Sequence, residues 1–195
     1  MGTSERRQRE IGELRNTILE HAARIIAQKG YAGFSIRKLA LSIDYSPRTI
    51  YLYFKDKDAI LLSLVEDSYA RTLDDRKSHP LPLDPNERVR IQLRNHITNA
   101  LSHPEQYRVI VDILHRDGFA SGPNQLELEE LVRQDIALMR SWETDVLLDA
   151  ALHTMFATIR GFTLHLVAHR ELLQTEELEI MVNTYVNWIT GGLSH

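Results

Sequence analysis

The segment between residues 35 and 57 constrains the fold most, because helix start and stop signals follow one another closely within it. Ser35 and Ser46 are of a type that caps helix N-termini, since a serine hydroxyl accepts a hydrogen bond from an unpaired amide of the first turn. A proline follows the second serine and suits the first helical position, where its missing N–H costs nothing. Asp44 stands between the two starts and tolerates the left-handed backbone that a helix stop often needs. The segment therefore predicts a helix, a tight turn, a short helix and, after a capping aspartate, a longer helix.

The residues of this segment divide into an apolar face and a polar face. Those that recur at helical spacing and should point inward are Ile36, Leu39, Ala40, Ile43, Ile50 and Phe54. The polar residues on the other faces of the second helix are Arg48, Thr49, Tyr51 and Tyr53. A helix with hydrogen-bonding groups on its outside can read base edges and phosphates in a DNA major groove. The residues alone leave open the alternative that the tyrosines are core aromatics with solvated hydroxyls.

The run from residue 39 to residue 61 resembles the N-terminal signature of tetracycline-repressor-like (TetR) transcription regulators. Its most telling part is Tyr51, one spacer and the pair Tyr53-Phe54, followed by Lys57 three residues later. The chain departs from that pattern at two positions, with Asp44 where glycine is usual and an arginine before the threonine where a small residue is common. The aspartate is acceptable on backbone grounds, whereas the arginine can alter which bases are read.

The resemblance implies a set of DNA-contacting residues. This set is Ser35, Arg37, Tyr45, Ser46, Pro47, Arg48, Thr49, Tyr51, Tyr53 and Lys57. Within it, Arg48 can form two hydrogen bonds to guanine O6 and N7. Tyr51, Tyr53 and Lys57 are expected to hold phosphates and to set the register of the helix on the duplex. The partner implied is double-stranded operator DNA.

Helical periodicity continues through the rest of the chain, with no strand-like alternation. We predict an all-α fold, with an N-terminal three-helix helix-turn-helix DNA-binding head on a larger helical body for ligand binding and dimerisation. The DNA-binding domain covers residues 1–56 and the ligand-binding and dimerisation domain residues 57–195. A helix over residues 57–77 links the two domains and is the natural lever between them. A glycine and proline loop at residues 118–124 separates two body helices, the second of which we expect Asn124 to cap.

The last two helices, Asp145 to about Arg170 and Thr175 to about Thr190, are expected to form a homodimer interface. The first is apolar on more than one face, as in a helix buried on more than one side. Four small residues on it, Ala150, Ala151, Ala157 and Gly161, permit close helix approach. Two such helices can form a four-helix interface with their copies around a two-fold axis. A charge placed at Phe156 or Val186 tests whether these side chains lie in that interface.

A small-molecule effector, apolar or aromatic, is expected inside the body. The candidate effector-binding residues are His96, Tyr107, His115, Phe119, Trp142, Met155, Arg160 and Phe162. An apolar cavity with a few polar groups is the usual form of such a site. Aromatic and methionine side chains at helical spacing are more often core than pocket, so the core reading of these residues stays open.

Charge is distributed unevenly along the chain. The net charge is −4, but residues 1–60 hold 11 Lys and Arg against 7 Asp and Glu, and the remainder holds 12 against 20. A basic head on an acidic body is what a phosphate-binding head requires. Chance asymmetry of a solvated surface explains the same numbers equally well.

Several other functions find little support in the residues. The chain has no cysteine, and no apolar run reaches the roughly 18 residues of a membrane span, so we expect a cytoplasmic protein without a signal peptide or membrane contact. His165 and His169 have metal-binding spacing but lack a compelling third ligand, so neither metal nor cofactor is expected. We expect a repressor that its effector releases from DNA, and not an enzyme. Two rivals remain: a ligand-independent DNA-binding protein of the same fold that acts with a protein partner, and an all-α enzyme or metal protein.

Overall fold

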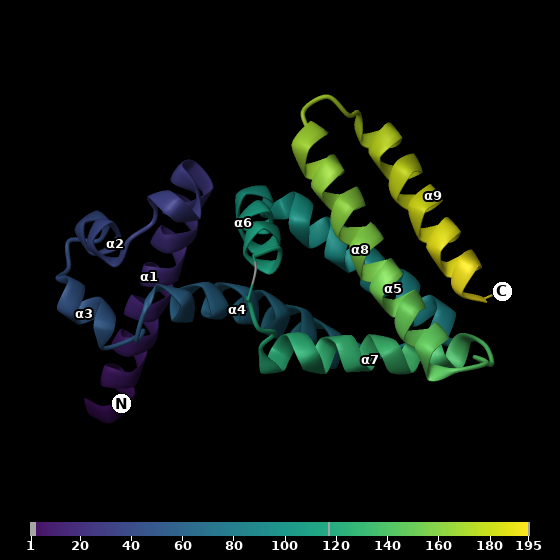
Figure 1. Cartoon of the computed structure of the whole chain (residues 1–195), viewed down its shortest axis with the longest axis horizontal. Helices are drawn as coiled ribbons and strands as arrows, with labels where there is room; N and C mark the ends of the chain where they lie inside the picture. The colour runs from purple at the N-terminus through teal and green to yellow at the C-terminus, as the bar shows by residue number, and fades with distance from the viewer. Residues whose placement is uncertain (1–2, 117, 195) are drawn as a thin grey trace. The chain divides into compact units, whose positions relative to one another are not determined.

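The computed structural model describes residues 3–116 and 118–194, and within these residues the chain is helical with no strand. The helices shown in Figure 1 are α1 (Thr3–Gly33), α2 (Ile36–Ser42), α3 (Pro47–Tyr51), α4 (Lys57–Ser78), α5 (Pro85–Ser102), α6 (Pro104–Leu114), α7 (Pro123–Met139), α8 (Asp145–His169) and α9 (Thr175–Ser194). The predicted all-α fold is therefore confirmed. In the described part of the chain, no helix has the length and apolar character needed to cross a membrane.

The chain divides into two compact units by its internal contacts. Unit 1 consists of Met1–Asp67 and Arg108–Ala120, and unit 2 consists of Ser68–Tyr107 and Ser121–His195. Helices α4 and α6 each begin in one unit and end in the other. The first unit therefore contains the predicted head together with most of α6, which the sequence did not associate with the head.

Helix boundaries in unit 1 follow the capping residues. The side chain of Ser35 accepts a hydrogen bond from the amide of Lys38 at the start of α2, and Asp56 Oδ1 accepts one from the amide of Ala59 at 2.7 Å near the start of α4. Gly30 interrupts α1 with φ 65° and ψ 170°, a backbone conformation that glycine adopts without strain. The unit closes over side chains that are almost fully buried, among them Ile18, Leu39, Ile50 and Ile60.

Unit 2 buries a core drawn from α4, α5, α7, α8 and α9, and α8 and α9 form an antiparallel hairpin beside one another (Figure 1). Asp84 caps α5 through the amide of Asn86, and Pro85 takes the first helical position, as the sequence predicts. Asn124 was predicted to cap the following helix, and this is wrong. Helix α7 starts two residues earlier than predicted, because Gly122 is the N-cap residue and Pro123 occupies the first turn.

Of the two side chains named as possible dimer contacts, Val186 lies in the core of unit 2 and Phe156 is partly buried against that core. A charge at either position would therefore disturb the packing of unit 2. The sequence pattern could not separate these roles, because both α8 and α9 carry apolar residues on more than one face. The exposed residues of the two helices are therefore the ones to consider for an interface.

Candidate nucleic-acid interface

The turn between α2 and α3 brings the two helices together over a shared apolar face. The amides of Ile43 and Tyr45 both donate to the carbonyl oxygen of Ala40, at 3.3 and 2.9 Å, which closes the end of α2. Asp44 between them has φ 57°, the left-handed conformation that its short polar side chain tolerates. The turn position that usually takes glycine thus keeps its geometry with aspartate.

The start of α3 is fixed by Ser46. Its hydroxyl accepts a hydrogen bond from the amide of Thr49 at 3.1 Å and lies 2.9 Å from the hydroxyl oxygen of Thr49. Pro47 occupies the first turn, where its ring matches the helical φ. These local interactions make a five-residue helix with a defined start, although a helix of this length is unstable by itself.

Tertiary packing then decides which face of α3 points outward. Ile50 is 0% exposed and Phe54 is 4% exposed, so these side chains anchor the helix to the unit 1 core. Arg48 and Tyr51, between and beside them, are exposed. The result is a short helix that presents an arginine and a tyrosine to solvent above an apolar base.

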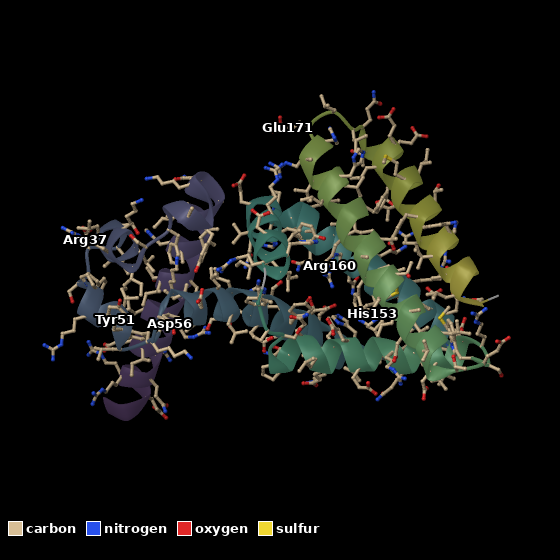
Figure 2. The ribbon with its side chains drawn as sticks, in the orientation of Figure 1. Arg37, Tyr51, Asp56, His153, Arg160 and Glu171 are labelled. Carbon is tan, nitrogen blue, oxygen red and sulfur yellow. The ribbon has the colours of Figure 1, made fainter. Side chains whose placement is uncertain are left out.

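The other residues of the predicted DNA-contacting set lie mostly on the same segment. Those that are exposed are Arg37, Tyr45, Ser46, Pro47, Arg48 and Tyr51, and those that are partly buried are Ser35, Thr49, Tyr53 and Lys57. Figure 2 labels Arg37 on α2 and Tyr51 at the end of α3. Every predicted residue therefore retains some surface for a phosphate or a base edge.

Lys57 has a partner inside the head. Its Nζ atom lies 3.9 Å from the centroid of the Tyr31 ring, and the guanidinium carbon of Arg116 lies 3.5 Å from the same centroid. Cations over an aromatic ring are attracted to its π-electrons. The Tyr31 hydroxyl also donates to Asp58 Oδ1 at 2.7 Å, and this hydrogen bond, aided by the charges of Arg116 and Lys57, lowers the pKa of the Asp58 carboxyl against the opposing effect of burial.

This cluster of Tyr31, Lys57, Asp58 and Arg116 was missed by sequence reasoning. Its members come from α1, α4 and the segment after α6, and no spacing rule relates residues so far apart.

Two exposed leucines of the head were also missed, with Leu41 at 70% and Leu52 at 78% exposure. The second of these could have been suspected, because it separates the two tyrosines of the signature and cannot share the inward face of Ile50.

The predicted effector residues divide between the two units. His115 and Phe119 belong to unit 1, whereas His96, Tyr107, Trp142, Met155, Arg160 and Phe162 belong to unit 2. His115 is exposed, and its Nδ1 atom lies 2.7 Å from the carbonyl oxygen of Val111. Six of the eight predicted effector residues therefore belong to one unit.

His96 and Tyr107 form the best-defined polar contact among the predicted effector residues. The His96 Nε2 atom lies 3.1 Å from the Tyr107 hydroxyl, which donates to the backbone oxygen of Arg160 at 3.4 Å. Burial, followed by the charge of Arg160, lowers the pKa of His96 to about 4, so the imidazole is neutral at pH 7. Burial also raises the pKa of the Tyr107 hydroxyl, so that it keeps its proton.

Apolar and aromatic side chains surround other parts of unit 2. Phe162 stacks on Tyr185 with ring centroids 4.3 Å apart, and burial raises the pKa of Tyr185 to about 12. Trp142 donates its indole N–H to the backbone oxygen of Ile136 at 3.1 Å, and Met155 is a core residue. Trp142 and Met155 thus have structural roles that explain them without a ligand.

Comparison with known proteins places the head in a family. Residues 18–64 match the family model described as bacterial regulatory proteins, tetR family. The chain is 31% identical to the HTH-type transcriptional regulator EthR of Mycolicibacterium smegmatis over 99 residues, which is 50% of this chain and 46% of that protein. The chain spans about half the length of curated relatives such as this one.

Solved structures extend the likeness in fold to most of the chain. BioQ in complex with its double-stranded DNA operator is 20% identical and matches with a TM-score of 0.65, covering 92% of this chain and 97% of that one. FadR from Bacillus subtilis in complex with stearoyl-CoA is 18% identical and matches with a TM-score of 0.71, covering 90% and 97%. Residues 18–64 thus carry the helix-turn-helix signature of the tetR family of bacterial regulatory proteins, and the whole chain shares its all-α fold with these solved structures.

Proposed function

We propose that this chain is a dimeric transcription regulator, a repressor that binds double-stranded operator DNA and leaves it when a small-molecule effector binds. The observation that carries the proposal is the α2–turn–α3 segment, in which Ile50 is buried while Arg48 and Tyr51 point to solvent. A helix of this kind can enter the major groove with its side chains toward the bases. That EthR is named a transcriptional regulator, and that BioQ was solved with operator DNA, support the same function.

The side chains of the head have separate roles in DNA binding. Arg48 reads a base edge, because a guanidinium can donate two hydrogen bonds to guanine. Tyr51 and Lys57 contact phosphates and fix the register of the helix on the duplex. The ammonium group of Lys57 lies over the Tyr31 ring, which orients it without removing its charge.

Dimerisation supplies the second recognition helix. On α8 the exposed residues at helical spacing are Ala150, Thr154, Ala157, Gly161, His165 and Ala168. A Cβ atom built at Gly161 meets no atom within 4 Å, so another helix can approach this surface closely. On α9, Trp188 is 66% exposed and adds a large apolar contact to the same proposed interface. Two copies joined by α8 and α9 present their α3 helices to half-sites about one helical turn apart.

The effector is an apolar or aromatic molecule with at least one polar group. The neutral His96 and the protonated Tyr107 form the polar end of its site, and Arg160 adds a positive charge beside them. Phe162 supplies an apolar wall of this site. The FadR structure holds stearoyl-CoA, which supports the idea that this fold accepts ligands with a long apolar part and an anionic head.

Coupling between the effector and the DNA can run through α6 as well as through α4, since both helices have residues in both units. Tyr107 lies at the last position of unit 2, and the rest of α6 belongs to unit 1, where Arg116 holds Tyr31 and Asp58. An effector that displaces Tyr107 therefore pulls on the helix that is packed into the head. The effector can change DNA affinity only if it binds the DNA-binding conformation and the released conformation with different affinities. DNA must then change effector affinity by the same factor.

The proposal is tested by selecting bound duplexes from a random DNA library and measuring their affinity by fluorescence anisotropy over a range of salt concentrations. We expect enrichment of a palindromic sequence whose half-sites are about one helical turn apart. Recovery of no preferred sequence would refute specific operator binding. A palindrome bound equally well in the presence of every apolar or aromatic compound screened would favour the ligand-independent rival.

A further inference from the structure

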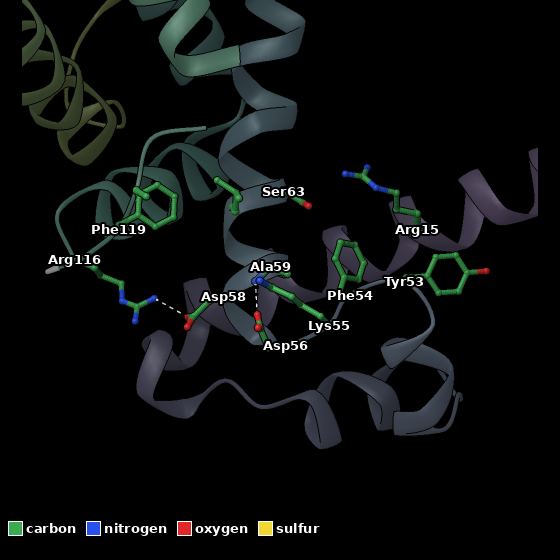
Figure 3. A pocket seen from close by; sticks show the side chains of 13 residues that line it. Arg15, Tyr53, Phe54, Lys55, Asp56, Asp58, Ala59, Ser63, Arg116 and Phe119 are labelled. Atoms are coloured by element: carbon green, nitrogen blue, oxygen red, sulfur yellow. Dashed lines mark hydrogen bonds and ion pairs between the residues drawn. The ribbon is translucent and has the colours of Figure 1, made fainter. Parts of the chain in front are cut away.

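A pocket in unit 1 lies apart from the effector network of unit 2. It has a volume of about 660 Å³ and is lined by residues of α1, the start of α4, the segment between α3 and α4, and the segment after α6. Figure 3 shows Phe119 and Arg116 on one side of α4, with Arg15 on the other and Ser63 between them. Small-molecule sites commonly have volumes of about 300–1,000 Å³, so the pocket has the size of a ligand site.

The floor of the pocket is apolar. Phe54 is buried at 4% exposure and closes the base, and Leu62 on α4 remains 36% exposed. Phe119 is partly buried and faces the same space from the segment after α6. The three aromatic rings of Tyr53, Phe54 and Phe119, with one leucine, favour a ligand with an aromatic part, since burial of apolar surface is favourable.

The acidic residues of the pocket are already satisfied within the protein. Asp56 Oδ1 accepts a hydrogen bond from the amide of Ala59 at 2.7 Å. Asp58 Oδ1 accepts the Tyr31 hydroxyl at 2.7 Å and lies 3.6 Å from the guanidinium of Arg116. Neither carboxylate is therefore free to repel an anion or to bind a cation in the pocket.

One of the three basic residues in the pocket, Lys55, is not paired with a carboxylate in the described part of the chain. Arg15 forms two hydrogen bonds with Asp67, at 2.9 and 3.1 Å, and Arg116 is held by Asp58 and by the ring of Tyr31. Lys55 makes no hydrogen bond or ion pair with any residue that the structure describes. Its long stem can lie along the apolar floor while the ammonium group stays at the edge of the pocket.

We propose that this pocket binds an aromatic organic anion, a carboxylate or a sulfonate, with its ring against Phe119 and Leu62 and its charge at Lys55. The site is distinct from the proposed effector network and does not depend on it. Lys55 is two residues from Lys57, and Tyr53 lines the pocket, so the bound anion brings negative charge next to side chains that we expect to contact DNA phosphates. Occupation of the pocket therefore lowers DNA affinity from within the head.

The absence of cysteine in the chain permits a direct test without DNA. Ser63→Cys places a single thiol in the lining of the pocket, and Ser78→Cys places one at the exposed end of the same helix as a matched control. The probe is 1-anilinonaphthalene-8-sulfonate, an aromatic anion, and the rate measured is alkylation by iodoacetamide. At ten times its Kd the probe should slow alkylation of the pocket thiol about tenfold, because only the free protein reacts. The control thiol should react at an unchanged rate.

The role of charge is tested with a neutral analogue and one further substitution. N-phenyl-1-naphthylamine lacks the sulfonate and should protect the Ser63→Cys thiol much less at equal concentration. Lys55→Gln in the same background should remove most of the protection by the sulfonate, and Lys77→Gln, on an exposed lysine of unit 2, should not. No protection by the sulfonate, equal protection of both thiols, or protection that is independent of Lys55 would each overturn the proposal. Because no DNA is present, failure here is separate from failure of the regulatory function.

Discussion

Asp135 is the residue whose loss should damage unit 2 most. It is 5% exposed, and its two oxygens lie 2.6 Å from Arg76 on α4 and 2.6 Å from Arg88 on α5. Both arginine side chains are themselves largely buried, at 8% and 14% exposure. One carboxylate on α7 thus joins three helices and forms ion pairs with two guanidinium groups that have little access to water.

The expected cost of Asp135→Ala follows from the charges that it leaves behind. Removing one partner of a buried ion pair costs about 3–5 kcal/mol, because the remaining charge stays buried without compensation. For a chain of this length, about 2–4 °C of Tm is lost for each kcal/mol, so Tm should fall by about 6–20 °C. If uncompensated charge is the cause, Arg76→Met and Arg88→Met combined with Asp135→Leu should recover much of the loss, since apolar replacement of a buried ionic cluster is often neutral.

The assay is thermal and urea unfolding followed by circular dichroism at one fixed protein concentration, because the Tm of the proposed dimer would depend on concentration. The control is Glu127→Ala, which breaks the exposed pair with Lys77 at 3.0 Å. Exposed pairs contribute about 0–1 kcal/mol, so the control should be nearly neutral. A loss of less than about 1 kcal/mol for Asp135→Ala would show that water reaches the arginines and that the reasoning from burial is wrong.

Three further predictions concern DNA binding, assembly and pH. Arg48→Ala should weaken specific DNA binding by about 1–3 kcal/mol and relax the preference at one base pair. Lys57→Ala should weaken binding to all sequences alike, and it should lower by about one the slope of log binding constant against log salt concentration. Binding titrations across salt concentrations measure both effects. Unchanged sequence preference in the first variant would remove Arg48 from the base edge. Gly161→Glu has open space in a protomer, so it should leave the fold intact and lower the dimer fraction toward the 22.5 kDa monomer in light scattering; an unchanged dimer would place the interface elsewhere. Burial lowers the pKa of His96 from 6.5 to about 4 in the folded state. Between these pH values the folded state binds fewer protons than the unfolded state. The free energy of unfolding should therefore fall by about 3 kcal/mol as the pH drops from 6.5 to 4. His96→Gln should flatten that dependence in urea unfolding, and equal slopes would contradict the assignment.

The helix starts and the turn of the head could be predicted from the sequence, because they depend on residues that are close together in the chain. Ser35, Ser46 and Asp56 each accept a hydrogen bond from an amide three residues ahead, so the residue types and their spacing already specify the contact. The left-handed backbone at Asp44 follows in the same way from what a turn of this kind requires. The inward face of α3 follows from the spacing of two apolar residues four positions apart.

The arrangement of the body could not be predicted to the same depth, because its decisive contacts join distant residues. Phe156 and Val186 look like interface residues on apolar helices, yet Val186 lies in the core of unit 2 and Phe156 packs against that core. Asp135 reads as one more acidic residue on an amphipathic helix, and only the fold brings it to Arg76, 59 positions away. Periodicity shows that a residue lies on a helix face, but it does not show which neighbour covers that face.

The two ends of α4 are held by different means, and this bears on how the regulator can switch. Near its start, Asp58 is bound to Tyr31 and Arg116 in unit 1, and near its end, Arg76 is bound to Asp135 in unit 2. We propose that α4, held in this way at both ends, carries the effect of the effector to the head. Asp135→Asn should therefore reduce the effect of an effector on DNA affinity while leaving DNA affinity without effector nearly unchanged, since no DNA-contacting residue is altered. An undiminished effector response in a folded Asp135→Asn protein would mean that α6, the other helix shared by both units, carries the coupling.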